Sequence, residues 1–362
     1  MSYWLRLKLH SSSSFYDTVS GRNAINARYG WCAKRQGKDK DMQKASYEYD
    51  VLVIGDVFCD IATKPIRAYP ERDRQIGCEF MLSIGGQAGN CAAACASLGL
   101  RTAIICKLSN DVLSNWLLSE LERLGVVCIA RSSERKPHPG ITVSIAFEDG
   151  SRSMLTDRGA NQDLMREDVE AELLGRARFV MRAGHWNTEG LFTVNKELLR
   201  IAKSHDAFTG VDIGWSAYLG WTGSAKQTVF ELLPFTDFLF VNEAELKELS
   251  GEQEEQEQEQ DILARGCRNV IIHRGVKGSS WVSSDFTVSS PSFKVKVVSP
   301  TGAGDVFNAG FIYAFLDGKA AEECLEFANA CAALHISRTR AHNEFPRLDE
   351  VQLESLNKQS SL

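Results

Sequence analysis

The sequence has little of several features that would assign it to a class at once. None of its apolar runs approaches the roughly 18–20 residues of a membrane span, so we expect no membrane-spanning helix and no membrane partner. Positive charge is not in surplus, since 41 Lys and Arg stand against 47 Asp and Glu. The net charge of −6 argues against a nucleic-acid partner, which needs clustered Lys and Arg. The sequence also lacks G-x-x-x-x-G-K-[ST], which excludes a P-loop enzyme.

The spacing of cysteine and histidine argues against two further kinds of site. The 10 cysteines include no C-x-x-C pair, and Cys91 and Cys95 lie in an alanine-rich stretch that predicts a helix. We therefore expect buried, reduced thiols, as in a cytosolic or organellar interior, rather than disulfides or a zinc site. The 7 histidines are scattered without the H-x-x-x-H spacing of a helical metal site.

The leader, residues 1–47, differs from the rest of the chain. It is basic and poor in acids up to Gln36, contains HSSSSF and shows little apolar periodicity. Such a segment resembles an organelle transit peptide and lacks the apolar core of a secretory signal. A disordered extension, or a start of translation at Met42, explains it equally well. We therefore expect a cytoplasmic protein, or a plastid or mitochondrial one if the leader is a transit peptide.

From Tyr49 onward, strand patterns alternate with helix patterns. The run YDVLVIGDVFCDI at 49–61 is nearly continuous in apolar residues, which is typical of a buried parallel strand. Helical patterns at 90–99, 115–125 and 191–205 separate several of the further strands. This alternation predicts a mostly parallel sheet with helices on both faces. The further predicted strands lie at 102–108, 177–184, 207–213, 237–243 and 269–275.

Two segments interrupt the alternation. Residues 140–156 alternate apolar and polar side chains around an Asp-Gly pair, which predicts an antiparallel hairpin and hence a small β flap. The acidic run GEQEEQEQEQD at 251–261 has no apolar face, so we expect a solvated loop or a frayed helix end without a function.

The stretch SPTGAGDVFNAGF at 299–311 places its smallest residues just before an aspartate and an apolar run. If a helix starts near Asp305, the first N–H groups from Gly302 onward lack intrahelical partners, and the helix dipole favours an anion there. Small side chains allow close approach to this backbone. Asp305 could then take a proton from a hydroxyl that attacks a phosphoryl group. A glycine-rich helix cap with Asp in the first turn remains the alternative.

A second glycine-rich stretch is SIGGQAGNCAAACASLG at 83–99. It follows a strand pattern and opens a predicted helix that ends at Gly99. Gly85 and Gly86 bare the backbone, and Asn90 offers both a donor and an acceptor to a polyol. A tight turn before an ordinary packed helix explains this stretch as well.

Together these motifs resemble those of the PfkB, or ribokinase-like, family of carbohydrate and nucleoside kinases. PTGAGDVFNAGF is similar to the C-terminal signature of the family, and GGQAGN followed by SLG resembles the N-terminal one. The resemblance covers about 49–352. It implies a three-layer α/β/α sandwich with a mostly parallel central sheet and a small β-sheet lid. We expect the kinase domain at 48–353, with the lid from about 62–83 and 138–158, and a C-terminal tail at 354–362.

The resemblance also implies a role for each matching residue. Asp305 resembles the catalytic base, and Glu245 of the N-x-x-E motif lies where the family places magnesium, which it would contact indirectly. The implied anion hole for the γ-phosphate is Gly302, Ala303 and Gly304. The implied substrate contacts are Asp60, Gly85, Gly86, Gln87, Asn90 and Arg158, and the implied nucleotide contacts are Asn242, Glu245, Gly275, Gly278 and Asn329.

The sequence departs from the family pattern at Ser299, at 184–185 and at 273–275, where HRG replaces a common threonine-containing version of the nucleotide loop. Ser299 stands where ribokinases have an aspartate that helps to bind a monovalent cation, so a potassium requirement is in doubt. Gly184 and His185 stand where ribokinases place an acid beside the sugar, which argues against ribose. Arg158 resembles arginines that meet acidic or phosphorylated sugars in some relatives; a lid arginine paired with Asp157 or with solvent explains it at least as well.

The resemblance implies a kinase that transfers the γ-phosphoryl group of ATP, with Mg²⁺, to a hydroxyl of a sugar or sugar derivative. A nucleoside kinase of the same fold is the nearest alternative, although the predicted lid has few aromatic residues that could stack on a base. The second alternative is a catalytically silent subunit of a larger complex. Lid-mediated homodimers occur in the family, and the sequence leaves this possibility open.

Overall fold

The computed structural model describes residues 47–338 and 343–359, so most of the predicted leader lies outside the described residues. A nine-stranded sheet in the order β13-β12-β11-β10-β9-β8-β1-β4-β5 forms the centre of the fold. Every neighbouring pair from β11 to β5 is parallel, whereas β12 and β13 are antiparallel additions at one edge. The strands are β1 (Tyr49–Ile54), β4 (Thr102–Leu108), β5 (Val127–Ser132), β8 (Ala177–Ala183), β9 (Phe208–Asp212), β10 (Phe238–Asn242), β11 (Asn269–His273), β12 (Ser279–Ser283) and β13 (Thr287–Ser290).

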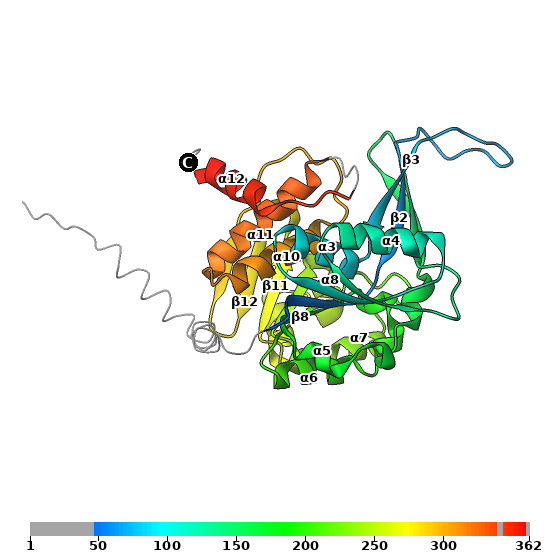
Figure 1. Cartoon of the computed structure of the whole chain (residues 1–362). Coiled ribbons are helices and arrows are strands. Elements are labelled where there is room, and N and C mark those ends of the chain that lie inside the picture. Colours follow the sequence, from blue (N-terminus) through cyan, green and yellow to red (C-terminus); the bar gives the residue numbers. More distant parts are fainter. Residues whose placement is uncertain (1–46, 339–342, 360–362) are drawn as a thin grey trace, which may run out of the picture. The chain divides into compact units, whose positions relative to one another are not determined.

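Helices cover both faces of this sheet, which confirms the predicted three-layer architecture (Figure 1). Because both faces are covered, the central strands read as continuous apolar runs rather than as alternating ones. On one face lie α3 (Gln87–Ser97), α4 (Val112–Arg123), α10 (Ala303–Leu316), α11 (Ala321–Ile336) and α12 (Leu348–Gln359), and on the other α5 (Ala171–Leu174), α6 (Asn195–Ser204), α7 (Gly223–Phe230), α8 (Glu243–Ser250) and α9 (Glu255–Ala264). The described residues include no helix that is both long and apolar enough to cross a membrane.

The first predicted strand, 49–61, is in fact two strands in two different sheets. β1 ends at Ile54, and β2 (Phe58–Thr63) belongs to the lid. The break falls where a Cβ on Gly55 would lie 2.0 Å from the carbonyl oxygen of Ala183, and where the buried Asp56 carboxylate accepts a hydrogen bond from the Ala88 N–H at 3.0 Å. Both strands are apolar, so the sequence pattern alone did not reveal the change of sheet.

The lid is a four-stranded sheet in the order β3-β2-β6-β7, drawn beside the main sheet in Figure 1. Its first strand begins at Phe58 rather than near 62, and β3 (Phe80–Gly85) pairs antiparallel with it. The predicted hairpin is confirmed, since β6 (Gly140–Ala146) and β7 (Arg152–Asp157) pair antiparallel around a turn in which Gly150 has a φ of 86°. The left-handed φ explains the glycine at this position.

The acidic run at 251–261 is not simply a loop or a frayed end. Its second half forms α9, in which Gln258 and Ile262 are buried. The Gln258 side chain donates hydrogen bonds to the carbonyl oxygens of Glu252 and Gln253 at 3.1 and 3.2 Å, which tie the start of the run to the helix. The prediction missed this helix because one buried glutamine takes the place of an apolar residue.

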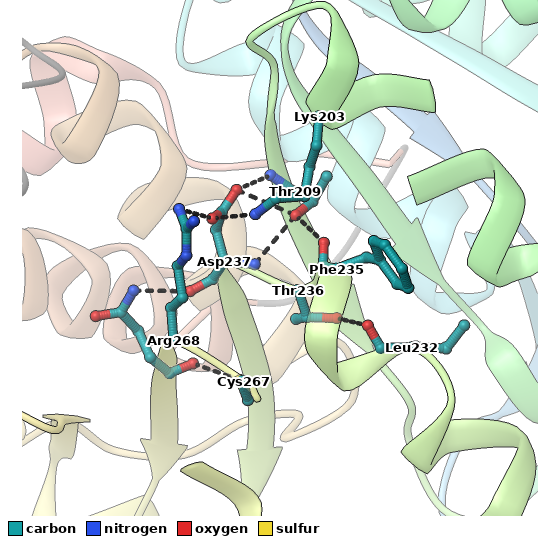
Figure 2. Close-up of polar contacts among 9 residues, drawn as sticks. Lys203, Thr209, Leu232, Phe235, Thr236, Asp237, Cys267 and Arg268 are labelled. Atoms are coloured by element: carbon teal, nitrogen blue, oxygen red, sulfur yellow. Dashed lines mark hydrogen bonds and ion pairs between the residues drawn. The ribbon is translucent and has the colours of Figure 1, made fainter. Parts of the chain in front are cut away.

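A buried carboxylate joins the amino ends of the central strands, on the edge opposite the glycine-rich stretches. Asp237, just before β10, is fully buried and forms ion pairs with Lys203 at 2.6 Å and Arg268 at 2.9 Å. Its other oxygen accepts hydrogen bonds from the N–H and hydroxyl of Thr209 at 3.1 and 3.2 Å. Figure 2 shows these side chains converging from α6, β9 and the start of β11. Because a buried charge is costly unless paired, this network stabilises the sheet only as a complete set.

Candidate active site

The predicted site segments meet at the carboxyl ends of the parallel strands. Hydrogen bonds connect residues that lie far apart in the sequence, including Gln87 with Asp212 at 2.6 Å and Asn90 with Asp305 at 2.8 Å. The strands β1, β8, β9, β10 and β11 all end at this edge. This edge is where open α/β sheets bind their ligands.

The TGAGD segment forms the start of α10, as the sequence predicted. Gly302 is the N-cap with a φ of 78°, a conformation that favours glycine, and the helix begins at Ala303. A Cβ on Gly304 would lie 3.3 Å from Nδ1 of His273, so a larger side chain would crowd this turn. The first-turn N–H groups therefore belong to a 14-residue helix whose dipole favours an anion at its start.

Asp305 lies in the first turn of α10 and is nearly buried, with an exposed fraction of 8%. Its Oδ2 accepts a hydrogen bond from Nδ2 of Asn90, which lies on α3. The two glycine-rich stretches thus meet at the proposed base. Asn90 was predicted as a substrate contact, and in this structure it contacts the carboxylate that would act on the substrate.

Asp60 lies in the lid and not at the end of the first strand of the main sheet. In the lid it stands opposite Ser83 of β3 and Thr142 of β6. Residues directly opposite one another in a sheet share a face, so these polar side chains form a row. A Cβ on Gly85 would lie 2.2 Å from Cγ of Asp60, so Gly85 makes room for this carboxylate.

Gly86 and Gln87 begin α3. Gly86 is the N-cap with a φ of 84°, and a Cβ there would lie 2.6 Å from the carbonyl oxygen of Asp56. The Gln87 side chain accepts a hydrogen bond from the N–H of Gly184 at 3.1 Å and donates one to Asp212. Gln87 was predicted to contact substrate, and both ends of its amide contact the protein here.

The predicted nucleotide residues other than Glu245 lie around a cavity of about 840 Å³. Such a volume is in the range of small-molecule sites. Asn329 donates hydrogen bonds to the carbonyl oxygens of Ser290 and Pro291, which hold one wall of this cavity in place. The lining includes Asn242, Gly275, Gly278 and Asn329 together with Ala303 and Gly304 of the glycine-rich segment.

Asn242 and Glu245 form a capping box at the start of α8. The Asn242 side chain accepts a hydrogen bond from the Glu245 N–H, and the Glu245 side chain accepts one from the Asn242 N–H, each at 2.9 Å. Burial raises the pKa of Glu245, and these hydrogen bonds oppose the shift. The motif therefore has a structural role, and it also places a buried carboxylate near the cavity.

Sequence reasoning missed several site residues, above all Asp212 at the end of β9. Burial raises the pKa of Asp212 well above its ordinary value, and the carboxylates of Glu245 and Asp305 add to the shift. Asp56 follows β1 in the same way and is fully buried. The signal in the sequence was an acid at or just beyond the end of a buried parallel strand, at the edge where ligands bind.

Arg158 and His185 have local partners. Arg158 forms an ion pair with Glu189 at 3.2 Å and lies over the ring of Tyr218 at 4.4 Å, so the expected pairing with Asp157 or solvent is wrong. The His185 side chain is fully buried and lies 2.8 Å from the Thr228 hydroxyl. Within the described ranges, no three or more His, Cys, Asp or Glu side chains gather as a metal site.

Comparisons with known proteins give the family of the chain. The model of the pfkB family carbohydrate kinases matches residues 49–347. Deoxyribokinase of Salmonella typhi is 23% identical over 308 residues, covering 83% of this chain and 97% of the relative. Ribokinase of Bacillus subtilis is 27% identical over 305 residues, covering 84% and 98%.

Solved structures show the same fold. A putative ribokinase II from E. coli in complex with ATP and Mg²⁺ has a TM-score of 0.77 at 22% identity, covering 85% of this chain and 99% of that one. Arabidopsis thaliana ribokinase complexed with ribose and ATP has a TM-score of 0.72 at 25% identity, covering 85% and 98%.

The family match and the fold therefore define a phosphotransferase with an alcohol group as acceptor, with a β lid beside the main sheet and no P-loop sequence. The chain belongs to the pfkB family of carbohydrate kinases, as the two glycine-rich motifs predicted, and its fold is the ribokinase-like one.

Proposed function

We propose that this chain transfers the γ-phosphoryl group of ATP to a hydroxyl of a neutral sugar or sugar derivative. The observation that supports this most directly is the hydrogen bond from Asn90 to Asp305, which holds a nearly buried carboxylate at the start of α10 beside the 840 Å³ cavity. The nucleotide would lie in that cavity, with its γ-phosphate at the backbone of 302–305. Asp305 would take the proton from the acceptor hydroxyl.

The reaction is a single displacement at phosphorus. The acceptor oxygen forms a bond to the γ-phosphorus, the bond from that phosphorus to the leaving oxygen of ADP breaks, and the acceptor proton moves to Asp305. Helix N–H groups aimed at the phosphoryl oxygens are worth most where water is excluded. Gly302 and Gly304 leave the space that this approach requires.

The site has the charge that a magnesium ion would neutralise. Asp212, Glu245 and Asp305 are each more than nine-tenths buried, and burial together with mutual repulsion raises the pKa of Asp212. Magnesium usually keeps several waters and contacts few protein carboxylates, so Glu245 would hold it through water. When bound, the ion would neutralise charge on the β- and γ-phosphates.

The acceptor would lie beneath the polar face of the lid. Asp60, Ser83 and Thr142 stand in one row across three lid strands, and hydroxyl and carboxylate groups suit a polyol. The charge of Arg158 is already compensated by Glu189, so the geometry favours a neutral sugar over a sugar acid or phosphosugar. The row offers hydroxyl and carboxylate groups to the acceptor, which favours a sugar over a nucleoside. A catalytically silent subunit would have no need of the Asn90–Asp305 pair.

The other face of the lid supports a homodimer. Phe80, Leu82 and Leu155 lie on that face with exposed fractions of 58%, 43% and 67%. Apolar patches of this kind on a sheet often mark an interface. We propose that two copies associate through this face, which sedimentation of the wild type and of Leu155→Lys would test.

The proposed function is tested by an ATP-consumption screen over neutral sugars, sugar acids, phosphosugars and nucleosides, with potassium present and absent. Turnover with a neutral sugar, without a potassium requirement, is the expected result. Turnover only with nucleosides would favour the alternative acceptor. No turnover with any compound, from protein shown to be folded, would favour the silent-subunit alternative.

A further inference from the structure

A chain of four polar side chains connects the start of α3, beneath the lid, with the nucleotide cavity. It begins at Gln87, whose Oε1 accepts a hydrogen bond from the backbone N–H of Gly184. Because that donor is fixed, the other end of the amide must be Nε2, and it donates to Oδ1 of Asp212 at 2.6 Å. The N–H of Gly214 donates to the same oxygen at 3.0 Å.

The second half of the chain runs from Asp212 to the cavity. Oδ2 of Asp212 accepts a hydrogen bond from Nδ2 of Asn308 at 2.6 Å. Asn308 therefore presents Oδ1 to Nε2 of His273, at 2.9 Å, and that nitrogen must carry the proton. Burial lowers the pKa of His273 to about 4, which agrees with a neutral ring whose Nδ1 lacks a proton.

The two ends of the chain lie in the two halves of the site. Gln87 is the first residue of α3, directly after the glycine pair that adjoins Asp60. His273 lines the nucleotide cavity, and its ring lies against Gly304 and, at 4.7 Å, against the ring of Phe307. The middle is sealed, since Asn308 is fully buried and Asp212 is 5% exposed. A shift at either end therefore changes hydrogen bonds that water cannot replace.

We propose that the Gln87–Asp212–Asn308–His273 chain couples the nucleotide cavity to the junction of β3 and α3 at 85–90, so that nucleotide binding orders this junction for the sugar. The proposal rests on the proposed function, because it assumes that a nucleotide occupies the cavity. These four are positioning residues: they act through Gly304 at one end and through the start of α3 at the other. A buried acceptor that loses one donor is costly, so the remaining members shift together.

The coupling can be tested without knowledge of the sugar, by hydrogen–deuterium exchange in the full chain with saturating Mg²⁺ and the non-hydrolysable analogue AMP-PCP. In the wild type we expect slower exchange at 273–278 and 302–306 and, in addition, at 85–97. In His273→Leu, saturated with AMP-PCP to the same occupancy, the slowing of exchange at 85–97 should be smaller by a factor of about five or more. This factor is the scale of a typical coupling between sites. His273→Gln keeps an N–H donor toward Asn308 and should restore the slowing.

A matched control is Asp237→Asn, which also alters a buried, hydrogen-bonded carboxylate between β9 and β10, but at the opposite edge of the sheet (Figure 2). This variant should keep the slowing at 85–97. If His273→Leu does not fold, Asp212→Asn breaks the same chain and should give the same loss.

The outcomes separate the two proposals. If the analogue slows exchange in the wild type at 273–278 and 302–306 but not at 85–97, the coupling is overturned and the proposed function is not. Equal slowing at 85–97 in wild type and His273→Leu would do the same. No slowing anywhere would mean that the cavity binds no nucleotide, and the proposed function would fall together with the coupling.

Discussion

Replacement of Asp305 by asparagine is the most direct test of the proposed chemistry. Asparagine has the same size and can keep the contact with Asn90 by presenting its Oδ1 to Nδ2 of that residue. It cannot accept a proton at neutral pH. General-base catalysis typically contributes about 10²–10⁴-fold, so kcat should fall by that order while the Kd of nucleotide changes little.

The effect of Asp305→Asn on stability should be small, because two terms oppose each other. Loss of a negative charge from the first turn of a helix costs about 0.3–1 kcal/mol. Loss of the same charge also removes its repulsion of the buried carboxylate of Asp212. At about 2–4 °C per kcal/mol for a domain of this size, we expect the Tm to change by less than about 4 °C.

The assay is steady-state kinetics with the best acceptor from the screen, with thermal unfolding as the measure of the fold. Asp317→Asn is the matched control, since Asp317 caps the other end of the same helix and forms an ion pair with Lys319 at the surface, at 3.3 Å. The control should keep the wild-type kcat. A folded Asp305→Asn protein with full turnover would refute the catalytic role and leave Asp305 as an acidic residue that stabilises the first turn of α10.

Three further predictions concern binding, stability and pH. Asp60→Ala should raise the KM of the acceptor about tenfold to a hundredfold for each charge-assisted hydrogen bond lost, with the KM of ATP unchanged. An acceptor KM equal to that of the wild type would remove Asp60 from the site. Asp237→Ala should lower the free energy of unfolding in urea by about 3–5 kcal/mol, because Lys203 and Arg268 lose their buried partner, while kcat stays the same; a fall in kcat would contradict a purely structural role. The pKa of His273 is lowered from 6.5 to about 4, so the folded state binds fewer protons than the unfolded state between these values, and stability should fall as the pH falls through this window. His273→Gln should show a smaller loss of Tm between pH 7 and 4, and equal slopes would contradict the assignment.

Much of the fold was predictable because buried parallel strands have a strong pattern. The strand predicted at 102–108 matches β4, and the hairpin around Gly150 was marked by its turn. The prediction of one strand at 49–61 was wrong because the two halves of this run are equally apolar although they enter different sheets. A strand pattern records burial, and it does not record which sheet provides that burial.

The candidate site was predictable where the backbone itself must be special. Gly86 and Gly302 have left-handed φ values that favour glycine, so their motifs are visible in the sequence. The glycine at 85 was visible in the motif, but the structural reason for it was not: the Cβ that it lacks would occupy the place of the Asp60 carboxylate. That reason depends on the pairing of β2 with β3, which no local pattern contains.

Residues that act through their neighbours were the least visible. Asp212, Asn308 and His273 lie on three different elements, and each has an ordinary explanation when taken alone: a strand end, a buried helix position and a strand end. Only the hydrogen bonds among them show that one carboxylate accepts donors from both halves of the site. Because Asp212 is buried, its donors cannot be exchanged for water, and the proposed coupling predicts that a substitution at one half changes the other.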